Sequence, residues 1–359
     1  MSRLIELGWD DVWAAQFDAM AQNGETPARV SLEHNHVFRV LGAEGEQLAE
    51  LAGRLRHEAQ GRSGMPAVGD WVLLRAANAQ GARPQIRAAL PRRSVFSRKS
   101  AGRGTEEQVV AANVDTVFLV SGLDQDFNAR RIERYLVMAR QSGAQPVIVL
   151  NKADLPVNVE RILRDIDAVA PNVPVHAVHA KGTGADVSAL RSYLTVGRTV
   201  ALLGSSGVGK STIINALAGR DLLKTGDVRE SDGRGRHTSV HRQLLVLDEG
   251  GVVIDTPGMR EIQLWEADEH VDEVFPEIEA RAGDCRFRDC RHETEPGCAV
   301  KAAVADGTVD ASRYESFLKL QHERDQFAAR QEERGQIEQK RQAKVMGKAI
   351  KAFQKERGR

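Results

Sequence analysis

The stretch Gly204-Ser205-Ser206-Gly207-Val208-Gly209-Lys210-Ser211 fits the pattern G-x-x-x-x-G-K-[ST], and we call it the phosphate loop. It lies between the aliphatic run TVALL and the helix-forming run KSTIINALAGR. Glycines in such a strand–loop–helix context let backbone N–H groups surround a phosphate chain. Lys210 can then reach the β- and γ-phosphates, and the Ser211 hydroxyl can ligate Mg²⁺. We therefore predict a nucleotide site that includes Gly204, Ser205, Ser206, Gly207, Val208, Gly209, Lys210, Ser211 and Thr212.

Around this loop, short aliphatic runs alternate with helical stretches. The runs are TVFLVSG (116–122), QPVIVLN (145–151), VPVHAV (173–178), TVALLG (199–204), QLLVLD (243–248) and GVVIDT (251–256). Strand followed by helix, repeated, predicts a mostly parallel α/β sheet. Only residues 248–251 separate the last two runs, so we expect those two strands to form an antiparallel hairpin.

Two further motifs complete the predicted nucleotide site, one near the γ-phosphate and one at the base. Asp255-Thr256-Pro257-Gly258 follows a strand, and Asp255 and Gly258 are the residue types that an NTPase places near the metal and the γ-phosphate. Asn151-Lys152-Ala153-Asp154, the base loop, follows another strand. The Asp154 carboxylate can accept two hydrogen bonds from guanine, whereas adenine offers no such donor pair. Asn151 and Lys152 would support this loop and cover the base.

The order of these motifs is reversed relative to ordinary GTPases, because the base loop precedes the phosphate loop. Such a circular permutation is physically permissible, since domain termini often lie close together at the surface. The chain is similar here to the translation-factor class of GTPases. That resemblance implies that Ala180 and Lys181, in the sequence His179-Ala180-Lys181, also contact guanine.

The polar segment 231–243 should contain the first switch. We predict Thr238 as the second Mg²⁺ ligand there. Met259 follows Gly258, and its thioether cannot hold a nucleophilic water. His237 is our candidate for that task, acting with Lys210 and Thr238 in catalysis. A partner-supplied arginine, or a His237 that is only a solvated loop residue, stays open as an alternative.

All three cysteines of the chain fall in one window, Cys285-x₄-Cys290-x-His292-x₅-Cys298. Three thiolates and one imidazole complete a closed tetrahedral shell of the kind that structural Zn²⁺ prefers. With no open coordination position, this site predicts a role in folding rather than in catalysis.

The flanking regions are expected to bind RNA. Residues 30–105 alternate in the manner of a small antiparallel barrel. They contain a run rich in cations and lacking acids, which we interpret as a phosphate-tracking groove in which Phe96 stacks on a base: Arg83, Arg87, Arg92, Arg93, Arg98, Lys99 and Arg103. Residues 1–29 are interpreted as a loosely attached leader.

The chain carries 50 Lys+Arg against 50 Asp+Glu, and it has neither a long apolar run nor a signal-peptide core. We therefore expect a soluble, cytoplasmic protein without a membrane partner.

Barrel, permuted GTPase domain and zinc module in this order resemble the ribosome small-subunit-dependent GTPase A family of bacteria. The resemblance implies an OB-fold RNA-binding barrel (30–105), a permuted GTPase domain (110–268) and a helical zinc-binding module (269–335). From their Lys and Arg content we expect residues 336–359 to form a basic tail. The resemblance further implies hydrolysis of GTP to GDP with Mg²⁺, binding to rRNA of the small ribosomal subunit during late maturation, and stimulation by that subunit; we expect a monomer. The alternative is a GTP-dependent RNA-binding scaffold whose hydrolysis is incidental.

Overall fold

The computed structural model describes residues 2–34, 37–58, 64–77, 82–99, 107–124, 127–182, 184–223, 242–255, 274–323, 325–326 and 329. The chain divides into two compact units, Met1–Gln263 and Leu264–Arg359, which we call the N-terminal and C-terminal units. The predicted residues His237, Thr238 and Gly258, and the tail 336–359, lie outside the described residues. Among the helices that are described, none has the length and apolar character needed to cross a membrane.

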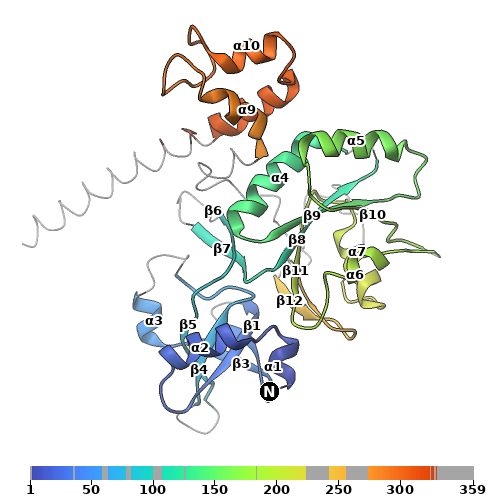
Figure 1. Cartoon of the computed structure of the whole chain (residues 1–359). Coiled ribbons are helices and arrows are strands. Elements are labelled where there is room, and N and C mark those ends of the chain that lie inside the picture. Colours follow the sequence, from blue (N-terminus) through green and yellow to red (C-terminus); the bar gives the residue numbers. More distant parts are fainter. Residues whose placement is uncertain are drawn as a thin grey trace, which may run out of the picture. The chain divides into compact units, whose positions relative to one another are not determined.

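The first part of the N-terminal unit is a five-stranded barrel (Figure 1). Strand β1 pairs with both β2 and β4, so the order closes as β1-β2-β3-β5-β4-β1. Its core side chains include Val30, Phe38, Val40 and Val72. This confirms the predicted OB-type barrel. Its elements are β1 (Glu25–His34), β2 (Val37–Gly42), β3 (Gly45–Leu51), α3 (Gly53–Glu58), β4 (Trp71–Arg75) and β5 (Gln85–Ala89).

Residues 1–29 differ from the loosely attached leader that we expected. They form α1 (Ser2–Glu6), α2 (Asp11–Met20) and the start of β1. Asp10 caps α2 by accepting a 3.0 Å hydrogen bond from the Trp13 N–H. Leu4, Leu7 and Trp13 are buried. Burial of these apolar side chains fixes the segment on the rest of the unit. Our prediction relied on the Gly- and Pro-containing sequence after α2, which carries no information about these tertiary contacts.

A buried arginine joins the barrel to the segment that follows it. Arg29 donates to the carbonyl groups of Leu7, Gly69 (3.1 Å) and Asn113 (3.0 Å). Burial lowers the pKa of Arg29 to about 10. A Cβ on Gly69 would lie 2.1 Å from the Ala112 carbonyl oxygen, so this approach requires glycine. The segment itself pairs β6 (Val95–Lys99) with β7 (Glu107–Ala112) in a two-stranded sheet.

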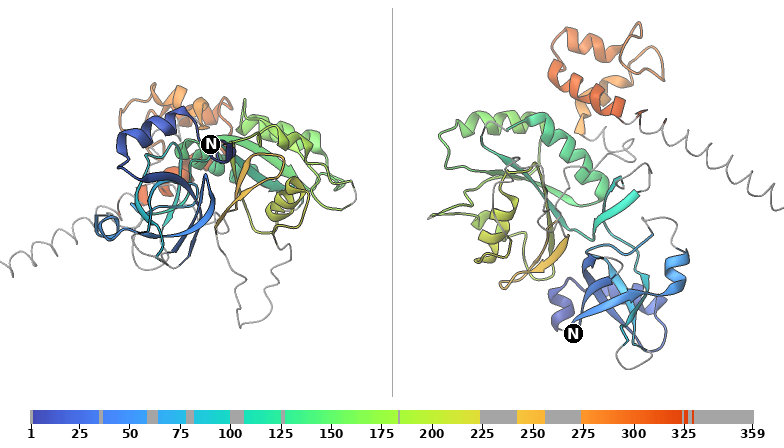
Figure 2. Two further views of the ribbon diagram at one scale, coloured as in Figure 1. Left: turned by 90° about the horizontal axis from the view of Figure 1, so that it is seen from below. Right: turned by 180° about the vertical axis from the view of Figure 1, so that it is seen from behind.

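The second part of the N-terminal unit is the predicted α/β sheet, with strand order β10-β9-β8-β11-β13-β12 (Figures 1 and 2). Neighbouring strands are parallel except for the β12–β13 hairpin, which confirms the expected antiparallel pair. Strand β12 also pairs with β1 of the barrel at Leu32–Gln243, so the sheet continues into the barrel. The strands are β8 (Thr116–Gly122), β9 (Gln145–Asn151), β10 (Val175–Ala177), β11 (Thr199–Gly204), β12 (Gln243–Val246) and β13 (Val252–Asp255).

Helices cover both faces of this sheet, as its aliphatic strands require. Helices α4 (Ala129–Ser142) and α5 (Val159–Val169) lie together on one face in Figure 1. On the other face, α6 (Ser188–Arg191) and α7 (Lys210–Ala218) contribute Leu190, Ile213 and Ile214 to one apolar cluster with strand residues such as Phe118. The sheet is thereby held rigidly beneath the loops at its carboxyl edge.

The described part of the C-terminal unit consists of helices joined by turns, in line with the predicted helical module. It contains α9 (Pro276–Ala282), α10 (Ala299–Ala305) and a helix at 311–323. Phe275 and Phe317 pack edge to face with ring centroids 5.7 Å apart. The buried Arg313 donates to Glu277 (2.5 Å) and to the Val274 carbonyl (2.8 Å), which ties the last helix to α9.

Candidate nucleotide site and metal centre

The predicted nucleotide motifs meet at one edge of the sheet. Strand β11 pairs in parallel with β8 and β13, with Gly204 opposite Val120 and Ala201 opposite Ile254. Strand β8 in turn pairs with β9 up to Gly122–Asn151. The phosphate loop, the base loop and Asp255 all follow carboxyl ends of these strands, and this is the edge at which open α/β sheets bind ligands.

Backbone geometry explains the glycines of the phosphate loop. A Cβ on Gly204 would lie 2.4 Å from the Val120 carbonyl oxygen. Gly207 and Gly209 have φ of 80° and 97°, the left-handed region that glycine adopts without strain. The Lys210 ammonium donates to the carbonyls of Gly204 (2.8 Å) and Ser205 (2.7 Å), which places its charge inside the loop.

Asn151 joins the base loop directly to the phosphate loop. Its side-chain amide donates a 2.8 Å hydrogen bond to the Val208 carbonyl, and the residue is buried. A Cβ on Gly209 would lie 2.2 Å from the Asn151 nitrogen, so this contact needs glycine at that position. Two motifs that are far apart in the sequence therefore form a single site.

The rest of the base loop is held by its neighbours. Lys152 adopts a left-handed backbone with φ of 66°, and its ammonium pairs with Asp124. The Ala153 N–H donates to the Val178 carbonyl at 3.1 Å. These contacts leave the Asp154 side chain 48 % exposed at the rim of the site.

The segment after β10 lies beside Asp154, as the base-contact prediction requires. The His179 Nε2 atom is 3.7 Å from the Asp154 Oδ1 atom. His179 exchanges backbone hydrogen bonds with Asp186, at 3.2 and 2.6 Å, which fixes this turn. Ala180 is buried and Lys181 is exposed.

Asp255 ends β13 close to the phosphate loop. Burial raises the pKa of its carboxyl, and the charge of Lys210 acts in the opposite direction. A buried carboxylate is stabilised in its charged form by nearby positive charge, so Asp255 is suited to a position beside Lys210 and a metal ion. Ser211 lies in the first turn of α7 and is half-buried.

Two residues at this edge escaped the sequence analysis. Asp124 pairs with Lys152, and Arg131 donates a 2.7 Å hydrogen bond from Nη1 to the Ser205 hydroxyl. Both follow β8, in the connection to α4 and in the first turn of that helix. The available signal was their position after a parallel strand, since no motif spacing marks them.

The structure corrects the interpretation of the basic run 83–103. Its arginines pair with acids from elsewhere in the chain: Arg83 with Glu50 (2.7 Å), Arg87 with Glu25 (2.6 Å), Arg92 with Asp70 (2.7 Å) and Arg93 with Asp10 (2.6 Å). Phe96 is 1 % exposed, so it cannot stack on a base. Arg87 and Arg92 pair with fully covered carboxylates and Phe96 lies in the core, whereas Arg83 and Arg93 form exposed ion pairs. The side chains of Arg98 and Lys99, and all of Arg103, lie outside the described residues.

A cavity of about 340 Å³ lies at the opposite edge of the sheet, beside the starts of β8, β9 and β11. Its two arginines are paired, Arg93 with Asp10 and Arg198 with Asp115. It contains none of the predicted nucleotide residues.

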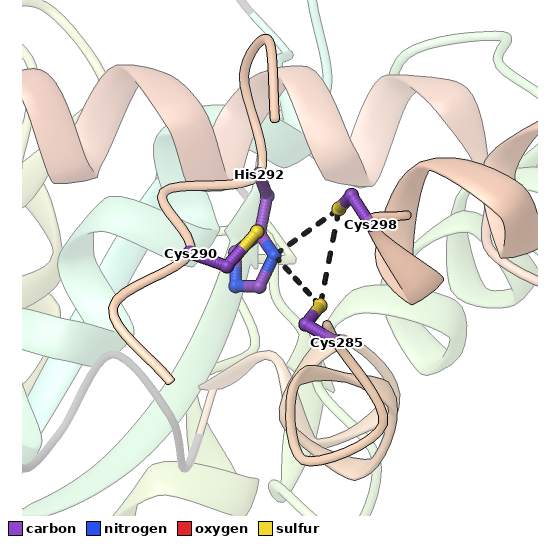
Figure 3. A group of neighbouring side chains, drawn as sticks. All are labelled: Cys285, Cys290, His292 and Cys298. Atoms are coloured by element: carbon purple, nitrogen blue, oxygen red, sulfur yellow. Dashed lines mark hydrogen bonds between the residues drawn. The ribbon is translucent and has the colours of Figure 1, made fainter. Parts of the chain in front are cut away.

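The predicted metal ligands converge in the C-terminal unit (Figure 3). The ligand atoms of Cys285, Cys290, His292 and Cys298 all lie within 4.8 Å of one another. Cys285 Sγ is 3.5 Å from His292 Nδ1 and 3.9 Å from Cys298 Sγ, and the latter is 3.4 Å from His292 Nδ1. A tetrahedral ion with bonds of about 2.0–2.3 Å has ligand–ligand edges of roughly 3.3–3.8 Å, close to these three separations, so the cluster fits a structural metal ion such as zinc.

The surroundings of the cluster bear on its charge. Burial raises the pKa of the Cys290 thiol and lowers the pKa of His292. For Cys285, burial acts upward, but hydrogen bonds from the N–H groups of Val300 and Ala299 and from the Cys290 and Cys298 thiols together lower its pKa. Cys298 caps α10 and accepts a 3.4 Å hydrogen bond from the Lys301 N–H. The buried neutral imidazole and the N–H groups aimed at sulfur suit a set of metal-bound thiolates.

Comparisons with known proteins show which family the chain is similar to. Residues 89–265 match the model of the family described as RsgA GTPase. The chain is 52 % identical over 338 residues, or 91 % of both chains, to the small ribosomal subunit biogenesis GTPase RsgA of Opitutus terrae. It is 40 % identical to the protein of that name from Syntrophotalea carbinolica, with 98 % of both chains covered.

Solved structures are similar too. YjeQ from Thermotoga maritima is 30 % identical with a TM-score of 0.60, and the match covers 83 % of this chain and 98 % of that one. YloQ, described as a circularly permuted GTPase, shares the fold with a TM-score of 0.57 at 22 % identity, over 86 % of this chain and 98 % of that one. With its reversed motifs meeting at one sheet edge, the chain belongs to the RsgA GTPase family and is an enzyme that hydrolyses GTP.

Proposed function

We propose that this GTPase acts in the cytoplasm on the small ribosomal subunit during its late maturation, binds the rRNA of that subunit and is stimulated by it. The names of its close relatives support the partner. The observation that supports the proposed nucleotide pocket is the hydrogen bond from Asn151 to Val208, because it joins the base loop to the phosphate loop.

In this pocket the residues divide by chemistry. Gly204 to Thr212 surround the phosphates, and Lys210 offsets their charge. Asp154 accepts hydrogen bonds from guanine, while Ala180 donates its N–H to the base and Lys181 covers it. Asp255 and Gly258 contact the γ-phosphate side. Mg²⁺ held by Ser211 and Thr238 would supply further positive charge to the phosphates.

Water activation falls to His237 in this proposal. Met259 occupies the position after Gly258 and has no group to orient water. An imidazole nitrogen of His237 can accept a hydrogen bond from the attacking water. We propose that docking on the small subunit places His237 against the attacking water and thereby stimulates hydrolysis.

The C-terminal unit supplies part of the RNA contact in this proposal. Arg286, Arg288 and Arg291 are exposed beside the metal cluster, and Phe287 is 40 % exposed. Exposed guanidinium and aromatic groups bind single-stranded RNA by charge and stacking. We propose that one Zn²⁺ per chain holds this surface together and that the protein acts as a monomer.

The test is a GTPase assay of the full chain alone, with purified small subunits and with purified large subunits. We expect stimulation by small subunits alone; equal rates in all three would remove the ribosome from the proposal. His237→Ala should lose the stimulated rate and keep its affinity for GTP. If subunit maturation proceeds normally with His237→Ala, the protein is a scaffold whose hydrolysis is incidental.

A further inference from the structure

Helix α4 brings a second cation to the phosphate loop. It begins after the Asn128 cap, which accepts a hydrogen bond from the Arg131 N–H at 3.3 Å. Strand β8, which precedes this helix, is the direct neighbour of β11, which precedes the phosphate loop. The first turn of α4 and the phosphate loop are therefore adjacent at the ligand-binding edge, although more than seventy residues separate them in the sequence.

Arg131 and Lys210 meet at one residue of that loop. The Arg131 guanidinium donates to the Ser205 hydroxyl at 2.7 Å, and the Lys210 ammonium donates to the Ser205 carbonyl, also at 2.7 Å. These two acceptors are neutral oxygens, and the charge of Lys210 also acts on the Asp255 carboxyl. Phosphate oxygens accept hydrogen bonds from charged donors much more strongly than neutral oxygens do, and guanidinium can engage them with two parallel bonds. A bound triphosphate would compete for both cations.

The reaction needs such a charge. Water oxygen bonds to the γ-phosphorus, the bond from that phosphorus to the bridging oxygen of GDP breaks, and the water proton ends on the phosphate or solvent. Negative charge spreads over the transferred group and the leaving oxygen in the transition state. An arginine that reaches this charge accelerates hydrolysis by about 10³–10⁵-fold in GTPases.

We propose that Arg131, at the start of α4, is a catalytic residue that contacts the γ-phosphate of the GTP bound to the same chain. Ser205 holds the guanidinium beside the phosphate loop before the triphosphate arrives. The proposal rests on the phosphate-binding role of that loop, which is part of the proposed function. It adds a group that none of the sequence motifs contains.

The test compares Arg131→Ala and Arg131→Lys with Arg130→Ala, whose side chain is exposed on the same turn. Single-turnover hydrolysis is measured at saturating GTP, with and without small subunits, and GDP affinity by calorimetry. We expect Arg131→Ala to slow hydrolysis at least 30-fold in both conditions and to change the dissociation constant for GDP less than threefold. Arg131→Lys should recover part of the rate, and Arg130→Ala should match the unaltered protein.

Two further variants separate the possible failures. Ser205→Ala keeps the guanidinium, so it should slow hydrolysis far less than Arg131→Ala. If Ser205→Ala reproduces the Arg131→Ala defect, or if Arg131→Ala weakens GDP binding as much as it slows hydrolysis, Arg131 only supports the loop. A rate within threefold of normal for Arg131→Ala also overturns the proposal. Lys210→Ala tests the site itself: undiminished hydrolysis there would overturn the proposed phosphate site, whatever Arg131 does.

Discussion

The side-chain amide of Asn151 donates a 2.8 Å hydrogen bond to the carbonyl of Val208 across 57 residues of sequence. In ordinary GTPases the base-reading loop follows the phosphate loop, and here it precedes it. The hydrogen bond shows that the reversed order leaves the two loops in contact. Circular permutation has changed the order in which the chain connects the two loops, but the loops still lie next to each other in space.

Asn151→Ala should weaken guanine-nucleotide binding about tenfold. The variant leaves the buried Val208 carbonyl without its partner, which costs about 1–3 kcal/mol, and it loosens the base loop. Calorimetric titration with GDP measures the effect. Asn158→Ala is the matched control, because Asn158 caps α5 and should lower stability without lowering affinity. Unchanged GDP affinity for Asn151→Ala would mean that the contact does not support the pocket.

His179→Ala should reduce selectivity for guanine. The imidazole is 3.7 Å from the Asp154 carboxylate, and we expect it to fix the rotation of that carboxylate, so that both oxygens face the base. Inosine nucleotides lack the exocyclic amine of guanine and can use only one of these contacts. The affinity ratio of GDP to IDP should therefore fall several-fold in the variant.

The control for this selectivity is His176→Ala. His176 lies on the same segment but bonds to the Tyr193 hydroxyl at 2.9 Å, away from Asp154. Its GDP-to-IDP ratio should equal that of the unaltered protein. Equal ratios in all three proteins would show that His179 does not orient the carboxylate.

Removal of the metal should unfold the C-terminal unit and leave the N-terminal unit folded, since the four ligands join its loops to α10. Zinc affinity should fall as the pH falls. Burial raises the pKa of Cys290, so the ion has to displace a proton there, and protons compete better at lower pH. Chelator competition at pH 6 and pH 8, with circular dichroism of the stripped protein, measures both effects. Helical content unchanged by chelation, or pH-independent affinity, would contradict this.

Glu25→Gln should destabilise the barrel by about 1–3 kcal/mol at neutral pH, because it breaks a charged pair whose carboxylate is fully covered. The Arg87 guanidinium lowers the pKa of Glu25 in the folded protein. A lowered carboxyl pKa stabilises the fold above the unfolded pKa, near 4.5, and this contribution is lost as the pH falls through the folded value. The difference between the two proteins in urea unfolding should therefore shrink below pH 4.5. Glu46→Gln, at an exposed pair with Arg39, should change stability by less than about 0.5 kcal/mol at any pH.

The sequence was sufficient where a motif or a period carries the chemistry. The alternation of strands and helices predicted the sheet, and residues 248–251 predicted the hairpin. The spacing from Cys285 to Cys298 predicted a cluster that the fold assembles. In each case the interacting residues are close in sequence, or, as with a cluster of cysteines and a histidine, their residue types rarely occur together except at a metal site.

Prediction failed where the partner of a residue lies elsewhere in the chain. The run that contains Arg87 and Arg92 has no acid within it, yet Glu25 and Asp70 fold onto these two arginines. Arg131 carries no motif, and its importance depends on the adjacency of two strands. Composition reports which charges are present, whereas pairing depends on topology.

The central claim is that the base loop and the phosphate loop form one pocket that selects guanine. Calorimetric titration of the full chain with GDP and with ADP tests it most directly, with Asp154→Asn measured beside the unaltered protein. We predict one site per chain, binding of GDP at least 100-fold tighter than that of ADP, and a shift of the Asp154→Asn variant from guanosine toward xanthosine diphosphate. Equal affinity of the unaltered protein for GDP and ADP would contradict the account.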